Sequence, residues 1–483
     1  MTGAARTAAV LLAAIASACA TIPSDRTAAL PVAASTLVAQ STFASSVVAP
    51  EAWPAADWWR QYRDPQLDAL ISEALAGSPS LRVADARTRE ALARAGAATS
   101  ARLPHVDAAL SSTRERFSEN GLLPPPYAGS WSTLSELNAS LSWQLDVWGK
   151  SRAAEASAVD TARAASIDAY AARLSLSVGV AHAYIQLERA YLELDVAQET
   201  LRQRQEIFAL TRDRNAAGID SRLELRQAES ALPAARERIV ELEETIQLTR
   251  DQLAALLGQG PDRGAAIARP NAQALADLAI PSRLPADLLG RRPDIAALRW
   301  RIAAAQSDVA TAKADFYPNI NLSALLGVQN LGPATFLSAA NREIGIGPAL
   351  SLPIFDAGRR RANLATRDAR YDATVEQYNQ ALADALRDVA DQLASARSVA
   401  AQRNEQQLGI AATQDAYDLA VLRYREGVGN YLQVLTAETQ LLAQRSLDVE
   451  LRARSLDLSV SLVRALGGGF AAAQDGSAPQ HSY

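Results

Sequence analysis

The sequence contains few of the residues from which metal and catalytic sites are built. Its 483 residues include one cysteine, Cys19, and three histidines, His105, His182 and His481. The histidines are scattered, so no set of metal ligands is expected, and the sequence has no nucleophile-elbow motif. A net charge of −5 gives no basic footprint for a nucleic acid. The sequence therefore predicts a protein that is not an enzyme and that binds no metal, cofactor or nucleic acid.

Long apolar runs are missing as well, since no stretch of about 18 or more apolar residues could span a membrane as a helix. Any passage through a membrane would therefore use strands. The N-terminus instead has the layout of a secretory signal, in which Arg6 precedes a short apolar run at residues 8–15. We expect residues 1–18 to be a signal peptide. Residues 19–50, which are rich in Ala, Ser, Thr and Pro, are expected to form a flexible tether.

The only cysteine follows this segment directly. Ala16, Ser17 and Ala18 lead into Cys19, and small residues before a single cysteine resemble a bacterial lipobox, whose thiol is lipidated and becomes the mature N-terminus. A lipid on Cys19 would anchor the tether to a membrane. The alternative is an ordinary signal peptide that is cleaved nearby, with an incidental cysteine. Ala20, rather than an aspartate, follows Cys19, which by analogy with related lipoproteins favours the outer over the inner membrane.

The most informative feature that is present is a long internal duplication. Leu145–Lys150 returns as Ile354–Arg359, and Arg214–Gly218 returns as Arg423–Gly427, in each case 209 residues later. Such a duplication means that one structural unit is used twice. The expected boundaries are a first repeat at 51–258, a linker at 259–292, a second repeat at 293–467 and a disordered tail at 468–483.

Each repeat is expected to contain one very long helix. Residues 151–217 include no proline and only one glycine, Gly179, so a single helix of about 67 residues would be about 100 Å long. Apolar residues recur in it at intervals of seven, which predicts coiled-coil packing. Residues 359–426 are expected to form its counterpart. The seven-residue series in the first copy is Val180, Leu187, Leu194, Leu201 and Phe208.

A helix of this length needs a partner of similar length. The helices expected at 80–101 and 220–257 would supply it if they stack end to end and run antiparallel to the long helix. The helix expected at 294–314 and the one ending at Gly467 would do the same in the second copy. Each chain would then contribute four helical columns. Pro233 is expected to kink the second of these helices.

Four segments alternate between apolar and small polar residues, as half-buried strands do. They lie at about 104–114, 137–145, 320–328 and 344–354. One face suits lipid and the other water, which is typical of an outer-membrane barrel with a wet lumen. Four strands cannot close a barrel, and open edges are not tolerated in lipid. The predicted fold is therefore an α+β membrane protein, with a trimeric 12-stranded β-barrel continuous with a long α-helical coiled-coil barrel.

Several short motifs, in a fixed order and in duplicate positions, carry a resemblance to a known family. Together they resemble the TolC/NodT-type outer-membrane factors of tripartite efflux systems over the chain after about residue 50. The motifs are Trp58-Trp59 with Asp64-Pro65, Arg291-Arg292-Pro293-Asp294-Ile295, Phe316-Tyr317-Pro318, Pro353-Ile354-Phe355-Asp356 with Gly358-Arg359, and Arg423-Tyr424 through Gly427 to Tyr431-Leu432.

The resemblance implies a homotrimer in the cell outer membrane, lipid-anchored at Cys19 and extending into the periplasm. It would be a passive exit duct for small molecules and drugs. The implied partners are the lipid bilayer, a periplasmic membrane-fusion adaptor that docks on the tube tip, and an RND-type inner-membrane pump driven by proton influx. Two alternatives remain: the outer-membrane component of a type I protein secretion system, and a coiled-coil structural protein without a pore.

The resemblance also implies a constriction where the long helices turn back. Threefold symmetry would convert each charge there into a ring of three, which can filter ions and gate passage. Gly429 stands where family members often carry aspartate, so Asn430, Tyr431 and Leu432 are the candidates for steric closure. The alternative is that the charges only cap helix ends and pair in solvent. The candidate gate and adaptor-docking residues are Gly218, Asp220, Arg222, Glu224, Arg425, Glu426, Gly427, Asn430, Tyr431 and Leu432.

Overall fold

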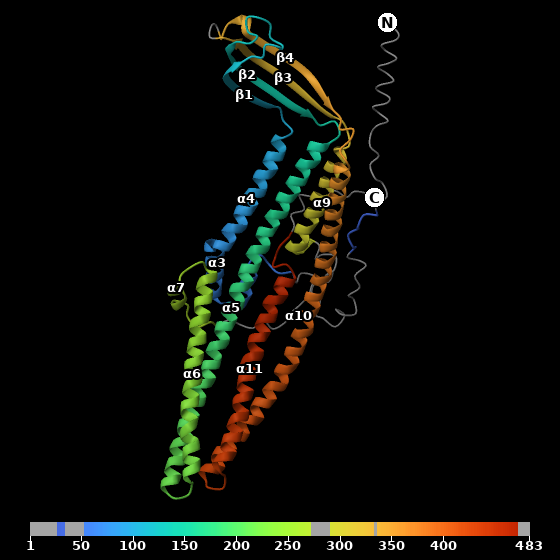
Figure 1. The fold of residues 1–483 in the computed structure, drawn as a ribbon. Coiled ribbons are helices and arrows are strands. Elements are labelled where there is room, and N and C mark those ends of the chain that lie inside the picture. Colours follow the sequence, from blue (N-terminus) through green and yellow to red (C-terminus); the bar gives the residue numbers. More distant parts are fainter. Residues whose placement is uncertain (1–26, 34–52, 272–289, 333–335, 472–483) are drawn as a thin grey trace.

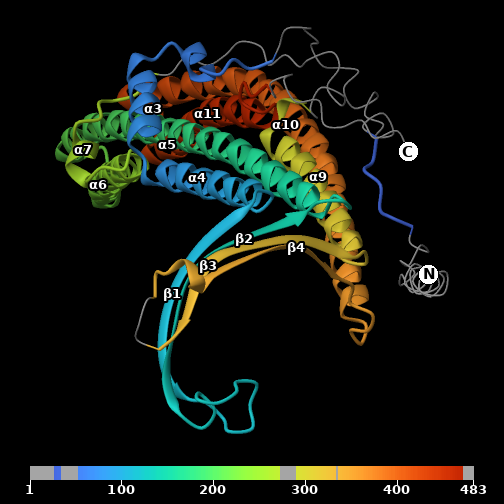
Figure 2. The ribbon, with the colours of Figure 1, turned by 90° about the horizontal axis from the view of Figure 1, so that it is seen from above.

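The computed structural model describes residues 27–33, 53–271, 290–332 and 336–471. A small sheet lies at one end of the chain, and long helices extend from it to a tip at the other end (Figure 1). Viewed from above, both the helical layer and the sheet curve without closing on themselves (Figure 2). The shape is that of a segment of a wall, not of a closed bundle.

The helices in chain order are η2 (Trp58–Tyr62), α3 (Pro65–Gly77), α4 (Pro79–Ser100), α5 (Lys150–Ala216), α6 (Arg222–Leu256), α7 (Pro261–Ala265), α9 (Pro293–Ala314), η3 (Ala339–Asn341), α10 (Arg359–Arg425) and α11 (Tyr431–Ala465). The strands are β1 (His105–Arg116), β2 (Trp131–Leu145), β3 (Asn319–Leu331) and β4 (Arg342–Ser351). The two long helices, α5 and α10, each have 67 residues, which confirms the lengths expected from the sequence.

The shorter helices stack end to end beside the long ones, as predicted. A side chain on Gly258, just after α6, would place its Cβ 2.6 Å from Cδ of Pro79 at the start of α4, so these two helix ends meet. Both α4 and α6 pack along α5. In the second copy, any side chain on Gly467 would collide with the Arg291 carbonyl ahead of α9, and α9 and α11 both pack along α10. The helix α6 continues through Pro233 as one helix.

The four strands form one antiparallel sheet in the order β1-β2-β3-β4. Leu137 of β2 lies between Leu110 of β1 and Val328 of β3, and Val328 faces Arg342 of β4. The register thus places most of the apolar residues of all four strands on one face, here called the apolar face, and most of the polar residues on the other, the polar face. This agrees with the alternation in the sequence.

The strand limits differ from the expected ones. β1 continues to Arg116 and β2 already begins at Trp131, so both strands extend beyond the segments expected at about 104–114 and 137–145. β4 ends at Ser351, and the last residues of the segment expected at 344–354 lie outside it. Pro353 lacks the backbone N–H that a further ladder bond would need.

The N-terminal aromatic segment docks onto the helices. Trp58 and Tyr62 are buried against α3 and α5 in the largest apolar cluster. The Tyr62 hydroxyl lies 2.6 Å from Ser459 Oγ of α11. Trp58 and Tyr62 therefore hold this segment against the helices.

Part of the tether is also held in place. The backbone N–H of Ala29 donates to Asp372 Oδ1 (3.0 Å) and that of Val32 donates to Asn379 Oδ1 (2.8 Å), so residues 27–33 follow α10. Cys19, the predicted signal peptide and all but the first residues of the predicted tail lie outside the described residues. Among the residues that the structure describes, no helix is both long enough and apolar enough to cross a membrane.

Candidate functional site at the helical tip

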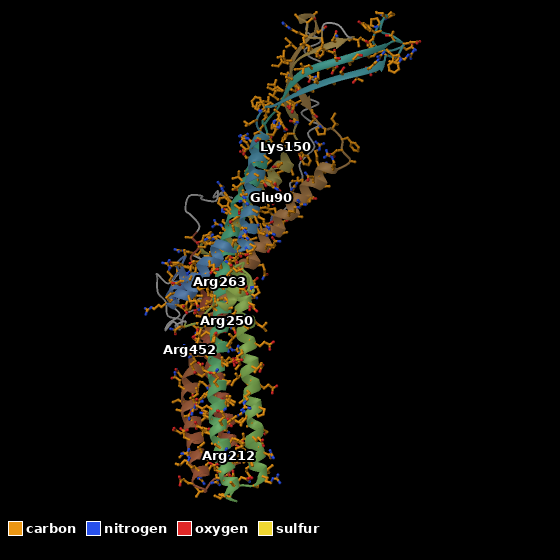
Figure 3. All side chains as sticks on the ribbon, turned by 90° about the vertical axis from the view of Figure 1, so that its left-hand side faces the viewer. Glu90, Lys150, Arg212, Arg250, Arg263 and Arg452 are labelled. Carbon is orange, nitrogen blue, oxygen red and sulfur yellow. The ribbon has the colours of Figure 1, made fainter. Side chains whose placement is uncertain are left out.

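The tip consists of two hairpin turns, one in each repeat. Gly218 follows α5 with φ +73°, and Gly427 follows α10 with φ +78°. A residue with a side chain is strained in this left-handed conformation, so the backbone favours glycine at both positions. Figure 3 labels Arg212, which lies close to this end of the chain.

Side chains cap the two helices that lead away from the turns. Ser221 begins α6 with a capping box, in which Glu224 accepts the Ser221 N–H at 3.0 Å. Asn430 begins α11 and accepts the Gln433 N–H through Oδ1 at 3.0 Å. Glu224 and Asn430 therefore stabilise the starts of α6 and α11.

A buried ion pair lies directly behind the first turn. Arg214 Nε is 3.0 Å from Asp220 Oδ2, and both side chains are about one-tenth exposed, at 10% and 9%. Arg214 Nη2 also donates to Asp220 Oδ1 (3.2 Å), which makes the pair bidentate. Asn215 Nδ2 donates to the Asp220 carbonyl oxygen (2.9 Å) and fixes the turn.

Tyr424 connects this ion pair to the second hairpin. Its hydroxyl donates to Asp220 Oδ2 (2.5 Å) and lies 2.8 Å from Thr211 Oγ1. The Arg214 guanidinium stacks over the Tyr424 ring, with Cζ 4.6 Å from the ring centroid. Tyr431 packs edge-on against the same ring, at 6.3 Å between centroids. We call Arg214, Asp220 and Tyr424 the tip latch, because they hold the two hairpins together.

The electrostatics of the latch favour the charged form of Asp220. Burial acts to raise the pKa of the Asp220 carboxyl, but hydrogen bonds from Arg214 and Tyr424 and the charge of Arg214 outweigh it and keep that pKa below its ordinary value. Burial, together with the hydrogen bond to Asp220, raises the pKa of Tyr424 to about 12. The latch is therefore a carboxylate with a neutral phenol at neutral pH.

Some of the remaining predicted residues are exposed at the tip, and others are buried between the hairpins. Arg222, Arg425 and Glu426 are exposed and are free to form rings in a symmetric assembly. Tyr431, a candidate for steric closure, is 4% exposed and packs between the hairpins, so it does not project from the tip. Leu432 does project, with 64% of its surface exposed.

Sequence reasoning missed Arg214, Thr211 and Tyr424 as site residues. Arg214 and Tyr424 both lie in the duplicated motif that ends at the turn glycines. That motif could have pointed to both residues as candidates. The duplication shows that the two turns are equivalent, but it does not show which side chains cross between them.

Exposed apolar side chains surround the tip. Ile219 and Val428 occupy equivalent positions in the two turns, 209 residues apart, and are 63% and 68% exposed. Leu223 and Leu432 are equivalent in the same way, and each is 64% exposed. We call these four residues the tip apolar set. A concentration of large exposed apolar side chains at one end of a molecule indicates an interaction surface.

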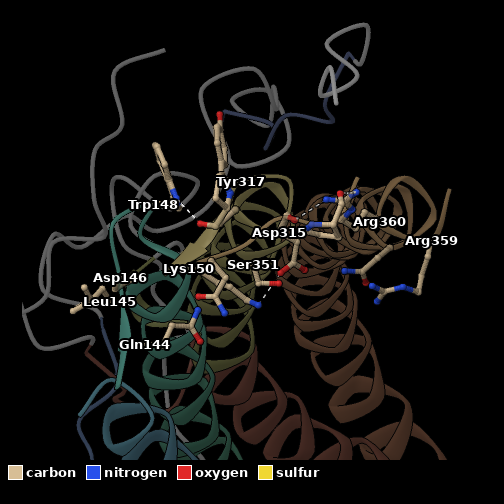
Figure 4. Close-up of a pocket in the computed structure, with 15 residues that line it drawn as sticks. Gln144, Leu145, Asp146, Trp148, Lys150, Asp315, Tyr317, Ser351, Arg359 and Arg360 are labelled. Atoms are coloured by element: carbon tan, nitrogen blue, oxygen red, sulfur yellow. Dashed lines mark hydrogen bonds and ion pairs between the residues drawn. The ribbon is translucent and has the colours of Figure 1, made fainter. Parts of the chain in front are cut away.

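A second feature lies where the sheet meets the helices (Figure 4). Lys150 at the start of α5 forms an ion pair with Asp315 after α9 (2.8 Å), beside a cavity of about 330 Å³. Trp148 stacks on Tyr317 at 4.8 Å and donates its indole N–H to the Pro318 carbonyl (2.8 Å). These contacts join the two repeats and fix the sheet on the helices.

Two duplicated aspartates at the same level have a structural role. Asp146 accepts the backbone N–H groups of Ser151 and Arg152, each at 2.9 Å. Asp356 accepts those of Gly358 (3.1 Å) and Arg360 (3.2 Å). Both carboxylates therefore cap the long helices. In the described ranges, no group of three or more His, Cys, Asp or Glu residues is placed to hold a metal ion.

Comparison with known proteins agrees with this architecture. The sequence matches the family described as outer membrane efflux protein over residues 70–259 and 284–468. It is 44% identical to the fusaric acid resistance protein FusA of Burkholderia cepacia over 66% of this chain, a match that spans 60% of that relative's length. It is 32% identical to the multidrug resistance outer membrane protein MdtP of Shigella flexneri, over 88% of this chain and 89% of that one.

The fold is also found in solved structures. The crystal structure of the outer membrane protein VceC from Vibrio cholerae superposes with a TM-score of 0.81 at 37% identity, covering 86% of this chain and all of VceC. The neighbours are trimeric channels with a barrel and a helical tunnel, so the four strands of this chain are one third of a 12-stranded barrel and the predicted fold class is confirmed. The chain belongs to the outer membrane efflux protein family.

Proposed function

We propose that this chain is the outer-membrane exit duct of a tripartite efflux assembly that expels small organic molecules. The observation that carries the proposal is the open, curved wall: a sheet with one apolar and one polar face, continuous with four helical columns. Three such walls enclose a polar passage. The family match favours efflux over protein secretion and over a structural protein without a pore.

The duct is passive, and energy comes from its partners. The names of similar proteins refer to fusaric acid resistance, multidrug resistance and pyoverdine export, which support small-molecule cargo. The proposed partners are a periplasmic adaptor and an RND-type inner-membrane pump. Because the pump loads the duct, the cargo is selected mainly before it reaches this chain.

The tip apolar set is the proposed contact for the adaptor. Ile219, Leu223, Val428 and Leu432 present similar apolar groups on both hairpins, so a trimer offers six related contact points. Arg222, Arg425 and Glu426 are exposed within a few residues of these groups in the two hairpins. An apolar centre with a charged rim is the usual composition of a protein interface.

The tip latch is the proposed gate element. It ties α5 and the first turn to α10, so a wider tip requires the hairpins to separate and the Tyr424–Asp220 hydrogen bond to break. Separation would leave the buried Asp220 carboxylate without the Tyr424 hydrogen bond and Arg214 without the ring over which it stacks, so the closed arrangement is favoured until a partner supplies compensating contacts.

The course of the tether supports lipidation of Cys19. Ten residues separate Cys19 from Ala29, and an extended chain of that length reaches about 33 Å. Ala29 is fixed to Asp372, 13 residues below the start of α10, which is a drop of about 20 Å. The cysteine can therefore reach the membrane next to the barrel. Wild-type protein purified from cells fed labelled palmitate is expected to carry the label, and Cys19→Ala is not. A wild-type protein as free of label as Cys19→Ala would contradict this anchor.

The proposed function is tested by conductance and export together. Purified trimers in a planar bilayer are expected to give discrete single-channel currents. Deletion of the gene is expected to sensitise cells to small toxic compounds, with the resistance restored by the intact gene. Currents absent from the trimer, or a defect limited to a secreted protein with unchanged drug tolerance, would reject the small-molecule duct.

A further inference from the structure

Positive charges in the sheet are confined to one face. The strands contain three arginines, Arg114 and Arg116 at the end of β1 and Arg342 at the start of β4. Arg342 faces Val328 in the ladder, and Arg114 and Arg116 continue the alternating series of Leu110. All three therefore lie on the apolar face, which is the outer face of the barrel.

Negative charges in the sheet are confined to the other face. Glu115 lies between Arg114 and Arg116, and Glu343 directly follows Arg342, so both point to the polar face. Asp107 and Glu136 are also on the polar face, since Asp107 faces Ser140 and Glu136 faces Ser111. This separation by sign means that the outer face is adapted to an anionic environment at the level of the arginines.

That level is the cell-surface end of the barrel. The arginines lie at the end of the sheet away from the helices, which extend into the periplasm. Arg114 is four residues beyond Leu110, or about 13 Å along the strand at about 3.3 Å per residue. Arginine on a lipid-facing surface is tolerated near the interface and not at the bilayer centre. The arginines thus reach the headgroups of the outer leaflet.

Closure of the barrel brings the arginines together at each subunit seam. β4 has 10 residues and β1 has 12. If every residue of β4 pairs antiparallel with β1 of a neighbouring copy, Arg342 lies opposite residue 114, 115 or 116 of that copy. The apolar face of β1 carries the even-numbered residues, so only pairing with residue 114 or 116 keeps the apolar residues of both strands on one face. Arg342 therefore lies opposite Arg114 of the partner subunit or Arg116 of the partner subunit.

Such a cluster needs a counter-anion. Among the described residues, Arg116 has an ion pair with Glu119 (2.9 Å), whereas neither Arg114 nor Arg342 has one. Like charges on opposed strand positions are destabilising, and guanidinium groups bind phosphate in a bidentate manner. Trp131, opposite Arg116 and 64% exposed, adds an aromatic contact for the adjoining acyl or sugar region.

We propose that each seam binds the phosphate groups of the phosphorylated glycolipid of the outer leaflet, the lipid A headgroup, through Arg114, Arg116 and Arg342. The site is incomplete in one chain and is formed only in the trimer. It rests on barrel closure and does not depend on which cargo the duct carries.

Native mass spectrometry of purified trimers with added lipid A tests the site. Wild-type protein is expected to retain up to three bisphosphorylated lipid A molecules. The R114Q/R116Q/R342Q variant is expected to bind at least about tenfold more weakly, because several charge-assisted hydrogen bonds are lost. The matched control is E115Q/E343Q, which alters the neighbouring residues on the other face and is expected to bind as the wild type does.

The same experiment separates phosphate recognition from general lipid binding. Enzymatically dephosphorylated lipid A and phosphatidylglycerol are expected to bind wild-type trimers at least about tenfold more weakly than bisphosphorylated lipid A. Equal binding of either probe, or unchanged lipid A binding by an intact triple-variant trimer, would overturn the proposal. If the triple variant fails to assemble, Arg342→Gln alone is measured, and unchanged affinity in that trimer overturns it equally.

Discussion

The Tyr424 hydroxyl donates a 2.5 Å hydrogen bond to the Asp220 carboxylate, 204 residues away in the sequence, and so joins the two hairpins. Asp220 also binds Arg214, and Arg214 stacks on Tyr424, so each member of the latch contacts the other two. Removing one member therefore leaves a buried polar group without its partner, which is costly.

Tyr424→Phe is expected to loosen the closed tip and to increase the mean single-channel conductance of the trimer. The variant keeps the ring but removes a hydroxyl bonded to a buried carboxylate, which costs about 1–3 kcal/mol. Tyr417→Phe is the matched control, because Tyr417 belongs to the same buried cluster and has no hydroxyl hydrogen bond among the described residues. Equal conductance of the two variants would show that the latch does not gate the duct.

The latch is expected to stay closed at neutral pH and to weaken only in strong acid. The pKa of Asp220 is lowered in the closed tip, so its stabilising effect is present above the ordinary carboxylate pKa of about 3.9 and is lost as the pH falls through the lower folded value. Conductance measured from pH 7 to pH 3 should rise only below about pH 4. Asp220→Asn should abolish the rise, and a midpoint near pH 6 would contradict this assignment.

Acidic substitutions in the tip apolar set are expected to weaken adaptor binding. Leu223→Asp and Leu432→Asp each place a charge where the interface would be apolar, and a loss of about tenfold in affinity corresponds to about 1.4 kcal/mol. Leu122→Asp, in the exposed loop at the sheet end, is the control. Surface-bound trimers and purified adaptor would measure the change, and full affinity in both tip variants would exclude these leucines from the contact.

β-Branched residues at the turn glycines are expected to impair docking and drug resistance. Gly218 and Gly427 have positive φ, so valine at either position adds backbone strain of about 1–2 kcal/mol. The control is Gly96→Val within α4, where a side chain meets nothing within 4 Å. Drug tolerance should fall for both turn variants and not for the control, and unchanged tolerance in both would remove these turns from the mechanism.

The long helices could be predicted from the sequence because their signal is purely periodic. Seven-residue spacing, the near absence of glycine and proline, and the terminal glycines gave α5 and α10 to within one residue at each end. The stacked columns followed from length alone, since a 67-residue helix cannot leave one face unpaired.

The strand ends could not be predicted in the same way. Near Trp131 and Arg116 the outward residues are Trp, Thr and Arg in place of aliphatic residues, so the alternation fades while the hydrogen-bond ladder continues. The tip latch was missed for a different reason. Its members come from separate repeats, and local spacing does not indicate that Tyr424 lies beside Asp220.

The carboxylates on the polar face of the sheet have a consequence for permeation. Each chain contributes four of them, Asp107, Glu115, Glu136 and Glu343, so a trimer holds twelve acidic groups inside one barrel. An aqueous passage lined by anions concentrates potassium and repels chloride. Under a salt gradient across the bilayer, the reversal potential should therefore have the sign that indicates a preference for cations. Replacing the four acidic residues by their amides should move the reversal potential towards zero.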